Sequence, residues 1–172
     1  MNNLPKIVFT DLDGVWTDGG MYYDAFGNEL KKFNTSDSAA VLFLKELNIP
    51  LVIITGENND IVKKRSEKLK IEHVLMGISN KINAAINFCN SLNIELNETA
   101  YIGDDIIDIP LLKKTKYSAC PNNSPDYVKA HCKWIMKKNG GEGVFREFIE
   151  KILIENHLFD EVINKIINKY SK

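Results

Sequence analysis

The stretch Ile7-Val8-Phe9-Thr10-Asp11-Leu12-Asp13-Gly14-Val15 joins an apolar run directly to two acidic residues that are two positions apart. The apolar run reads as a buried strand, so Asp11 and Asp13 follow its carboxyl end. A carboxylate at the edge of an apolar core is unfavourable unless a cation, a proton or several hydrogen-bond donors accompany it. The stretch therefore predicts a central strand and, at its end, a site for a charged group.

Further apolar runs of strand length recur along the chain, and amphipathic segments of helical length separate them. We expect strands at Lys6–Thr10, Leu51–Thr55, His73–Leu75, Thr99–Ile102, Tyr117–Ala119 and Lys133–Ile135. Helices are expected near Asp37–Leu47, Asn59–Leu69, Lys81–Leu92, Ile106–Lys113 and Ser124–Ala130. The alternation and the continuous apolar strands predict an α/β fold with a doubly wound (Rossmann-like) parallel sheet.

Two segments depart from this alternation. Gly19–Phe33 reads as a β-hairpin with a glycine-containing turn, and its place after the acidic pair favours a flap over a site. Near the end, a glycine-rich turn precedes two amphipathic helices, Val144–Ile154 and Leu158–Ile167. We expect these C-terminal helices, within about residues 142–169, to close the sheet, and the whole chain, residues 1–172, to form a single domain.

The composition excludes several classes of protein. The 172 residues are 44% hydrophobic with a net charge of -1, which suits a soluble domain and gives no basic field for nucleic acid. No apolar run is long enough to span a membrane, and the N-terminus lacks a signal-peptide pattern. Scattered cysteines (Cys89, Cys120 and Cys132) indicate reduced thiols. We therefore predict a cytoplasmic protein with neither a nucleic-acid nor a membrane partner.

Polar residues stand at the ends of several predicted strands. Thr55-Gly56 follows the second strand, Gly103-Asp104-Asp105 follows the fourth, and Lys81 begins a helix. Taken alone, Thr55-Gly56 can be an ordinary strand end, Gly103-Asp104-Asp105 a helix cap, and Lys81 a solvated residue at a helix start. Together they fall at one edge of a parallel sheet, which is where such sheets bind ligands.

This set of residues suits phosphoryl transfer. Carboxylates are the ligands that Mg²⁺ prefers. A carboxylate nucleophile, Asp11, can form an aspartyl phosphate, while Asp13 protonates the leaving alkoxide and later activates water. Thr55 and Lys81 can hold the phosphoryl oxygens, whose charge has to be stabilised in the transition state.

These motifs resemble the four motifs of the haloacid dehalogenase superfamily of phosphotransferases. The resemblance implies that Asp11 is the nucleophile and Asp13 the acid/base. It implies Mg²⁺ as cofactor, with Asp108 supporting the ion through water. The metal ligands would be Asp11, the backbone carbonyl of Asp13, and Asp104, and the phosphate would be bound by Thr55, Gly56 and Lys81.

Spacing narrows the resemblance to one branch. Neither the interval from Asp11 to Thr55 nor that from Thr55 to Lys81 leaves room for a cap domain, which usually needs ~50 residues or more. The chain thus resembles the capless sugar-acid phosphatases, namely the 3-deoxy-D-manno-octulosonate 8-phosphate phosphatases and their nine-carbon relatives. Members form tetramers in which hairpins and neighbouring chains complete each site. The resemblance implies a homotetramer with inter-subunit active sites and substrate contacts at Asn34, Thr35 and Ser36.

One departure bears on the substrate. The eight-carbon enzymes usually carry arginine after this Thr-Gly, whereas this chain has Glu57. With Arg65 and Lys68 on the same segment, it looks closer to the 2-keto-3-deoxy-nononate 9-phosphate phosphatases. Glu57 would accept hydrogen bonds from sugar hydroxyls, and Arg65 would clamp the substrate carboxylate, which it can do across a subunit boundary. A solvated helix face is the alternative for Glu57 and Lys68.

The sequence therefore predicts a Mg²⁺-dependent phosphatase for a 9-phosphorylated nine-carbon 2-keto-3-deoxy sugar acid of the sialic-acid type. The main alternative substrate is 3-deoxy-D-manno-octulosonate 8-phosphate. Two further alternatives are a receiver-type signalling module and a non-catalytic protein that binds sugar-acid phosphates. A receiver domain lacks the acid/base that Asp13 supplies, and non-catalytic relatives often lose a motif acid, whereas this chain keeps all of them.

Overall fold

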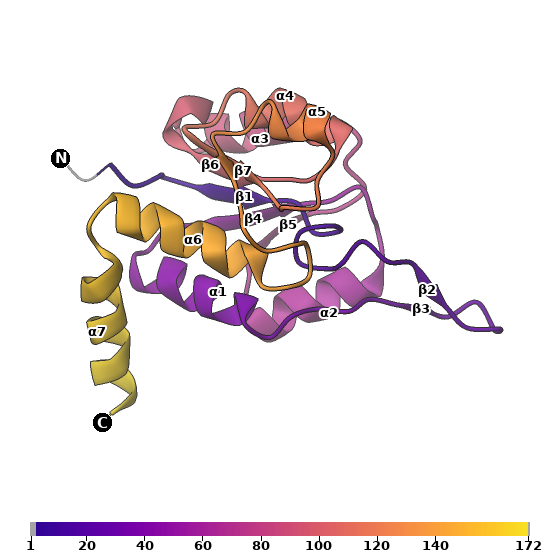
Figure 1. The fold of residues 1–172 in the computed structure, drawn as a ribbon, viewed down its shortest axis with the longest axis horizontal. Helices are drawn as coiled ribbons and strands as arrows, with labels where there is room; N and C mark the ends of the chain where they lie inside the picture. Colours follow the sequence, from indigo (N-terminus) through magenta and orange to yellow (C-terminus); the bar gives the residue numbers. More distant parts are fainter. Residues whose placement is uncertain (1–2, 172) are drawn as a thin grey trace.

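The computed structural model describes residues 3–171, and its centre is a six-stranded sheet in which every neighbouring pair is parallel. The strand order is β5-β4-β1-β6-β7-β8 (Figure 1). Their bounds are β1 Val8–Thr10, β4 Leu51–Ile54, β5 His73–Leu75, β6 Ala100–Ile102, β7 Tyr117–Cys120 and β8 Trp134–Ile135. The predicted doubly wound sheet is confirmed. Strand order reverses at β1, so the ends of β1 and its two neighbours flank the expected ligand crevice.

Helices cover both faces of this sheet (Figure 1). On one face lie α1 (Asp37–Glu46), α2 (Asp60–Leu69) and α6 (Val144–Glu155), and on the other lie α3 (Lys81–Ser91), α4 (Ile109–Leu112) and α5 (Asp126–Lys129). β1 supplies both cores, because Val8 joins the core under α1 and α6 whereas Phe9 joins the core under α3 and α4. This double burial explains why the strand sequences are continuously apolar.

The segment after β6 differs from the expected helix at Ile106–Lys113. It forms a 3₁₀ turn, η2 (Ile106–Asp108), and then the short helix α4. Pro110 lies in the first turn of α4 and has no N–H with which to continue a helix from η2. The side chain of Asp108 also accepts hydrogen bonds from the backbone N–H groups of Asp104 and Asp105, which bends the loop around that carboxylate. A second 3₁₀ turn, η1 (Leu96–Glu98), lies before β6.

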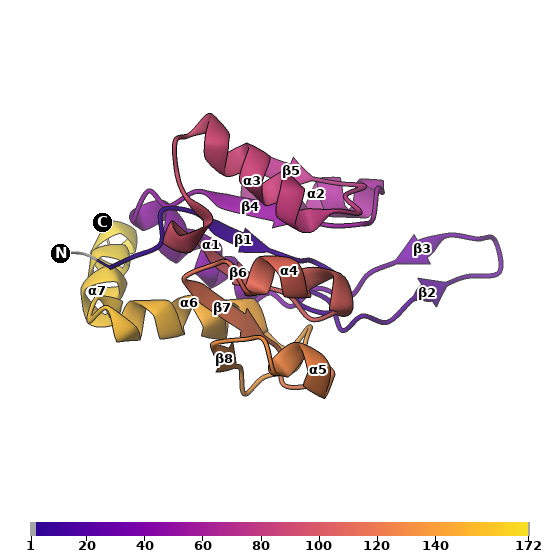
Figure 2. The same cartoon turned by 90° about the horizontal axis from the view of Figure 1, so that it is seen from above.

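The predicted hairpin is present as β2 (Tyr22–Tyr23) and β3 (Glu29–Leu30), which pair antiparallel. Its turn is built around Asp24, whose carboxylate accepts hydrogen bonds from the N–H groups of Phe26 and Asn28. The hairpin projects well beyond the body of the molecule (Figure 2). Its base lies beside the strand ends, but its tip extends away from them.

The C-terminal helices pack on the sheet's helical layer, as expected. α6 and α7 (Phe159–Tyr170) both contact α1. Between the motifs, residues 3–171 contain the hairpin, single helices, one 3₁₀ turn and strands of the central sheet, so this part of the chain has no cap domain. A single domain over residues 1–172 stays a prediction, and residues 1, 2 and 172 lie outside the described part. Within that part, no helix combines the length and apolar character needed to cross a membrane.

Candidate active site

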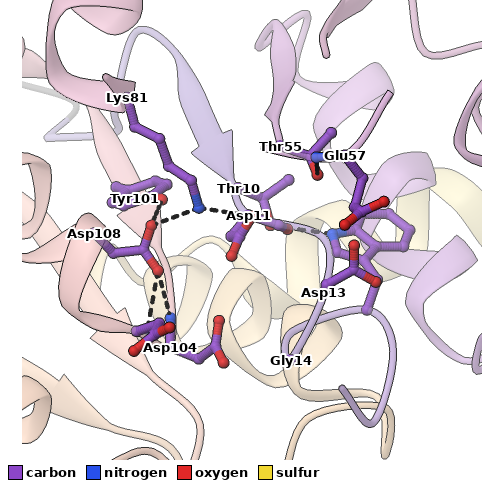
Figure 3. Close-up of polar contacts among 12 residues, drawn as sticks. Thr10, Asp11, Asp13, Gly14, Thr55, Glu57, Lys81, Tyr101, Asp104 and Asp108 are labelled. Atoms are coloured by element: carbon purple, nitrogen blue, oxygen red, sulfur yellow. Dashed lines mark hydrogen bonds and ion pairs between the residues drawn. The ribbon is translucent and has the colours of Figure 1, made fainter. Parts of the chain in front are cut away.

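A pocket of about 330 Å³ opens at the carboxyl ends of β1, β4 and β6. It brings together the residues that the sequence singled out on separate strand ends (Figure 3). Its lining consists of Asp11, Asp13, Gly14, Gly19, Met21, Thr55, Gly56, Glu57, Lys81, Asp104, Asp105 and Ile107. All the predicted catalytic and phosphate-binding residues therefore share one cavity.

Lys81 is the centre of a buried charge network under this pocket. Its side chain is only 1% exposed, and Nζ lies 2.8 Å from Asp11 Oδ1 and 2.7 Å from Asp108 Oδ1 (Figure 3). Tyr101, from β6, donates its hydroxyl hydrogen to the same Asp108 oxygen at 2.5 Å. Because Asp108 also binds two backbone N–H groups through Oδ2, its carboxylate is fully engaged with the protein. Asp108 thus fixes Lys81 and the loop that carries Asp104.

The backbone around the site leaves no room for extra side-chain atoms at two glycines. Gly14 has a positive φ of +82°, and a Cβ there would lie 2.0 Å from Asp104 Oδ2. A Cβ on Gly103 would lie 2.5 Å from Asp108 Cγ. Asn80 caps α3 by accepting a hydrogen bond from the N–H of Asn83, which places Lys81 at the first helical residue. The spacing of the motifs thus reflects close backbone packing around the acids.

Without an added cation, burial and mutual repulsion disfavour the charged forms of Asp11 and Asp104. Burial raises the pKa of Asp11 to about 6, and the positive charge of Lys81 only partly opposes this effect. Burial, together with the negative charges of Asp11 and Asp108, raises the pKa of Asp104 to about 9. Burial lowers the pKa of Lys81, but the two neighbouring carboxylates outweigh it and leave the pKa above its usual value.

The same carboxylates fit a divalent metal ion. One oxygen from each of Asp11, Asp104 and Asp108 lies within 4.8 Å of the others. Asp104 Oδ1 is buried and has no hydrogen-bond partner among the described residues. An all-oxygen ligand set with unrelieved negative charge is the environment that Mg²⁺ prefers. Since Asp108 is already engaged, Asp11 and Asp104 are the carboxylates free to contact such an ion.

Two hydrogen bonds, made by Thr10 and Trp16, hold the backbone of Asp11. Thr10 Oγ1 donates to the carbonyl oxygen of Asp11 at 2.7 Å, and Trp16 Nε1 donates to Thr10 Oγ1 at 3.0 Å. Trp16 in turn stacks on Phe145 of α6, with ring centroids 4.5 Å apart. On the neighbouring strand, the buried Thr55 hydroxyl accepts a hydrogen bond from the N–H of Glu57. Hydrogen bonds therefore hold both strand ends.

The predicted sugar contacts divide into two groups. Glu57 is half-buried and lines the pocket, whereas Asn34, Thr35, Ser36, Arg65 and Lys68 do not line it within this chain. Arg65 instead donates to Asn34 O and Ser38 Oγ and lies over the Phe33 ring. Thr35 and Lys68 are exposed. The substrate-binding roles of these residues stay predictions.

Sequence reasoning missed two polar residues next to the acids. Tyr101 interrupts an apolar strand, which was the available signal for a buried hydroxyl with a partner. Lys31 lies 2.7 Å from Asp13 Oδ1 and reaches it from the base of the hairpin. The only signal for Lys31 was the alternation of Glu29 and Lys31, which puts two opposite charges on one side of a strand.

A doubly wound sheet whose central strand ends in two acids, with a threonine, a buried lysine and a third acid around the same pocket, defines the phosphotransferases of the haloacid dehalogenase class. In agreement, the haloacid dehalogenase-like hydrolase family matches residues 74–148. The chain is 33% identical over 148 residues to the 3-deoxy-D-manno-octulosonate 8-phosphate phosphatase KdsC of Haemophilus influenzae, covering 86% of this chain and 82% of that protein. The chain belongs to this phosphatase family.

Other relatives agree with this assignment. The KdsC phosphatase of Escherichia coli strain K12 is 31% identical over 156 residues, covering 91% of this chain and 83% of that protein. Among solved structures, the Moraxella catarrhalis 3-deoxy-D-manno-octulosonate 8-phosphate phosphatase superposes with a TM-score of 0.90 at 33% identity, covering 96% of this chain and 94% of that one. That structure holds a magnesium ion, a phosphate ion and a KDO molecule.

Proposed function

We propose that this protein is a Mg²⁺-dependent phosphatase of a phosphorylated 2-keto-3-deoxy sugar acid, with 3-deoxy-D-manno-octulosonate 8-phosphate as first candidate substrate. The observation that carries the proposal is the shared pocket, in which Asp11, Asp13, Thr55, Lys81 and Asp104 meet. The eight-carbon substrate is favoured by the relatives, which are 3-deoxy-D-manno-octulosonate 8-phosphate phosphatases and match over most of their length.

The proposed reaction proceeds in two steps. Asp11 attacks phosphorus, the ester P–O bond breaks, and Asp13 gives a proton to the departing alkoxide. Asp13 then takes a proton from water, which attacks phosphorus and releases phosphate and Asp11. Thr55, Gly56 and Lys81 hold the phosphoryl oxygens.

Asp11, the backbone carbonyl of Asp13, and Asp104 would hold Mg²⁺. Asp108, expected from the sequence to support the ion through water, has both carboxylate oxygens engaged and would instead support it by holding the loop that carries Asp104. When bound, Mg²⁺ supplies positive charge that offsets the repulsion between the carboxylates and the phosphate. The raised pKa values of Asp11 and Asp104 support this assignment, because they mark negative charge that the protein alone does not balance.

A nine-carbon, 9-phosphorylated sugar acid of the sialic-acid type is the second candidate substrate, and Glu57 favours it. Glu57 lines the pocket and is half-buried, so its carboxylate faces the space that a sugar would occupy. A carboxylate accepts hydrogen bonds from hydroxyls and repels the substrate's own carboxylate, whereas an arginine does the reverse. Glu57 therefore supports a substrate that presents hydroxyl groups at this position.

A substrate panel tests both candidates. It compares kcat/KM for 3-deoxy-D-manno-octulosonate 8-phosphate, 2-keto-3-deoxy-nononate 9-phosphate and N-acetylneuraminate 9-phosphate, with and without Mg²⁺. A tenfold preference, which corresponds to about 1.4 kcal/mol, decides between the eight- and nine-carbon acids. If Glu57 sets the choice, Glu57→Arg lowers kcat/KM for the nine-carbon acids most. Absence of Mg²⁺-stimulated phosphate release from all three would contradict the proposal.

We further propose a homotetramer in which neighbouring chains complete each active site. The hairpin exposes Met21, Tyr23, Phe26 and Leu30, with Phe26 90% exposed, and large exposed apolar patches often mark subunit contacts. Lys68 lies outside the pocket of its own chain and is exposed, so a neighbouring chain can reach it.

A further inference from the structure

Lys31 is buried although its neighbours on the hairpin are not. Its side chain is 2% exposed, whereas Leu30 is 64% exposed and the side chain of Lys32 is 69% exposed. Its Nζ lies 2.7 Å from Asp13 Oδ1, across a separation of 18 positions in the chain. A lysine is rarely this buried without a specific carboxylate partner. The hairpin thus inserts one positive charge beside the proposed acid/base.

We propose that Lys31 is a positioning residue that orients the Asp13 carboxylate for proton transfer. Asp13 Oδ1 accepts hydrogen bonds from Lys31 Nζ at 2.7 Å and from Thr17 Oγ1 at 3.2 Å. Asp13 Oδ2 accepts none from the described residues. One carboxylate oxygen is therefore anchored by two donors, which leaves the other oxygen to carry the proton to and from the substrate.

Lys31 is itself held by a second carboxylate. Nζ lies 3.4 Å from Glu29 Oε1, and Glu29 Oε2 accepts a hydrogen bond from Asn59 Nδ2 at 3.4 Å. Asn59 also caps α2, because its side chain accepts a hydrogen bond from the N–H of Val62. This chain of contacts connects the start of α2, the hairpin and Asp13. It limits the rotamers of Lys31, as a group that positions a catalytic acid requires.

The inference rests on the proposed role of Asp13, and leaving-group dependence tests it. A nitrophenolate leaves phosphorus without a proton, whereas a sugar alkoxide needs one from Asp13. Because kcat/KM reports the steps up to leaving-group departure, it includes the general-acid step and excludes the later hydrolysis of the aspartyl phosphate. We would compare p-nitrophenyl phosphate with the most active sugar-acid phosphate of the panel for Lys31→Met, Lys31→Gln and Lys31→Arg. Lys32→Met is the matched control, since Lys32 is exposed.

We expect Lys31→Met and Lys31→Gln to lower kcat/KM for the sugar-acid phosphate by ~10²-fold and for p-nitrophenyl phosphate by less than ~5-fold. Lys31→Arg should restore most of the lost activity, because it returns a cation to Asp13. Lys32→Met should change neither substrate. Calorimetric titration with Mg²⁺ alone should give wild-type affinity in the Lys31 variants, since Lys31 contacts no proposed metal-binding oxygen.

Equal losses on the two substrates, with no rescue by arginine, would overturn the inference and indicate a merely structural ion pair. Lys31→Gln keeps a hydrogen-bond donor and serves if Lys31→Met fails to fold. A wild-type ratio of the two kcat/KM values in Lys31→Gln would also overturn the inference. The proposed function fails separately, because it requires the wild-type protein to release phosphate from a sugar-acid phosphate. If the wild type hydrolyses a sugar-acid phosphate and every Lys31 variant keeps the wild-type ratio of kcat/KM for the two substrates, the proposed function stands and the positioning role is refuted.

Discussion

Single buried charges decide the character of the site. Asp11, Asp104 and Asp108 lie close together, and Lys81 pairs with two of them, Asp11 and Asp108. Lys81 therefore has a structural task, holding two carboxylates together, besides its proposed task of binding phosphate. Removing the lysine from such a network is costly, because it leaves negative charge uncompensated in a low-dielectric interior.

Lys81→Met tests this structural task. It should lower the free energy of unfolding by about 3–5 kcal/mol at neutral pH, because two buried carboxylates lose their cation. Urea denaturation without metal measures the change. Lys165→Met is the matched control: Lys165 pairs with Glu161 at 2.7 Å but is exposed, so a far smaller change is expected. A similar small change for both variants would show that the Lys81 network is not stabilising.

Asp11→Asn separates chemistry from folding. Replacing the proposed nucleophile should reduce kcat by at least ~10³-fold. Burial raises the pKa of Asp11 to about 6, so at pH 7.5 the folded wild type holds an unfavourable charge that asparagine removes. The metal-free variant should therefore melt no lower than the wild type. Full activity in the variant would contradict the aspartyl-phosphate mechanism.

At the scale of elements, the start of α1 is joined to α6 through one buried acid, Asp37. Asp37 begins α1 and is fully buried, and its Oδ1 accepts a hydrogen bond from the N–H of Arg146 in α6. Its Oδ2 has no partner among the described residues. Burial raises the pKa of Asp37 to about 6, although the charges of Lys138 and Arg65 oppose this effect. We therefore expect the junction of α1 and α6 to respond to pH.

Asp37→Asn should remove that sensitivity. Between pH 4 and 6 the folded wild type keeps a proton on Asp37 that the unfolded chain has lost, so this contribution to stability falls as pH rises. Above pH 6 the variant should be more stable than the wild type by up to about 3 kcal/mol. Denaturation curves at pH 4, 6 and 8 measure the difference. Asp60→Asn, the exposed first residue of α2, should show no such trend.

At the scale of the whole molecule, the hairpin is the element that projects from the body of the chain (Figure 2). A two-stranded hairpin that exposes several aromatic side chains is marginal in water, and it would gain most from packing against other copies. Its base also delivers Lys31 to Asp13. The proposed tetramer and the proposed acid/base would therefore be connected through one element.

Tyr23→Ser combined with Phe26→Ser should dissociate the proposed tetramer, because both side chains are more than half exposed in the isolated chain. Light scattering coupled to size-exclusion chromatography gives the mass. We expect a fall in kcat/KM for the sugar-acid phosphate to accompany dissociation. Tyr170→Ser, which removes a 73% exposed aromatic residue from α7, is the control. A wild-type protein that is monomeric at micromolar concentration would refute the tetramer.

Local sequence was sufficient for the fold class. Val8 and Phe9 are both apolar because β1 is buried on both faces, and this pattern distinguishes a parallel sheet from a half-exposed one. The same logic placed Asp11, Thr55 and Asp104 at one edge, since parallel strands end on the same side. The segment expected as one helix at Ile106–Lys113 is instead a 3₁₀ turn followed by a short α-helix, because Pro110 and the side-chain hydrogen bonds of Asp108 divide it.

The sequence by itself determined the alternating α/β architecture, the acids at the strand ends and the class of chemistry, because hydrophobic period and residue type are local properties. Only the tertiary structure decided the order of the strands, the burial of Lys81 between two carboxylates, and the reach of Lys31 from the hairpin to Asp13. Those features depend on which distant residues pack together. Packing is set by the shape and charge of the folded chain, which no single stretch of sequence contains.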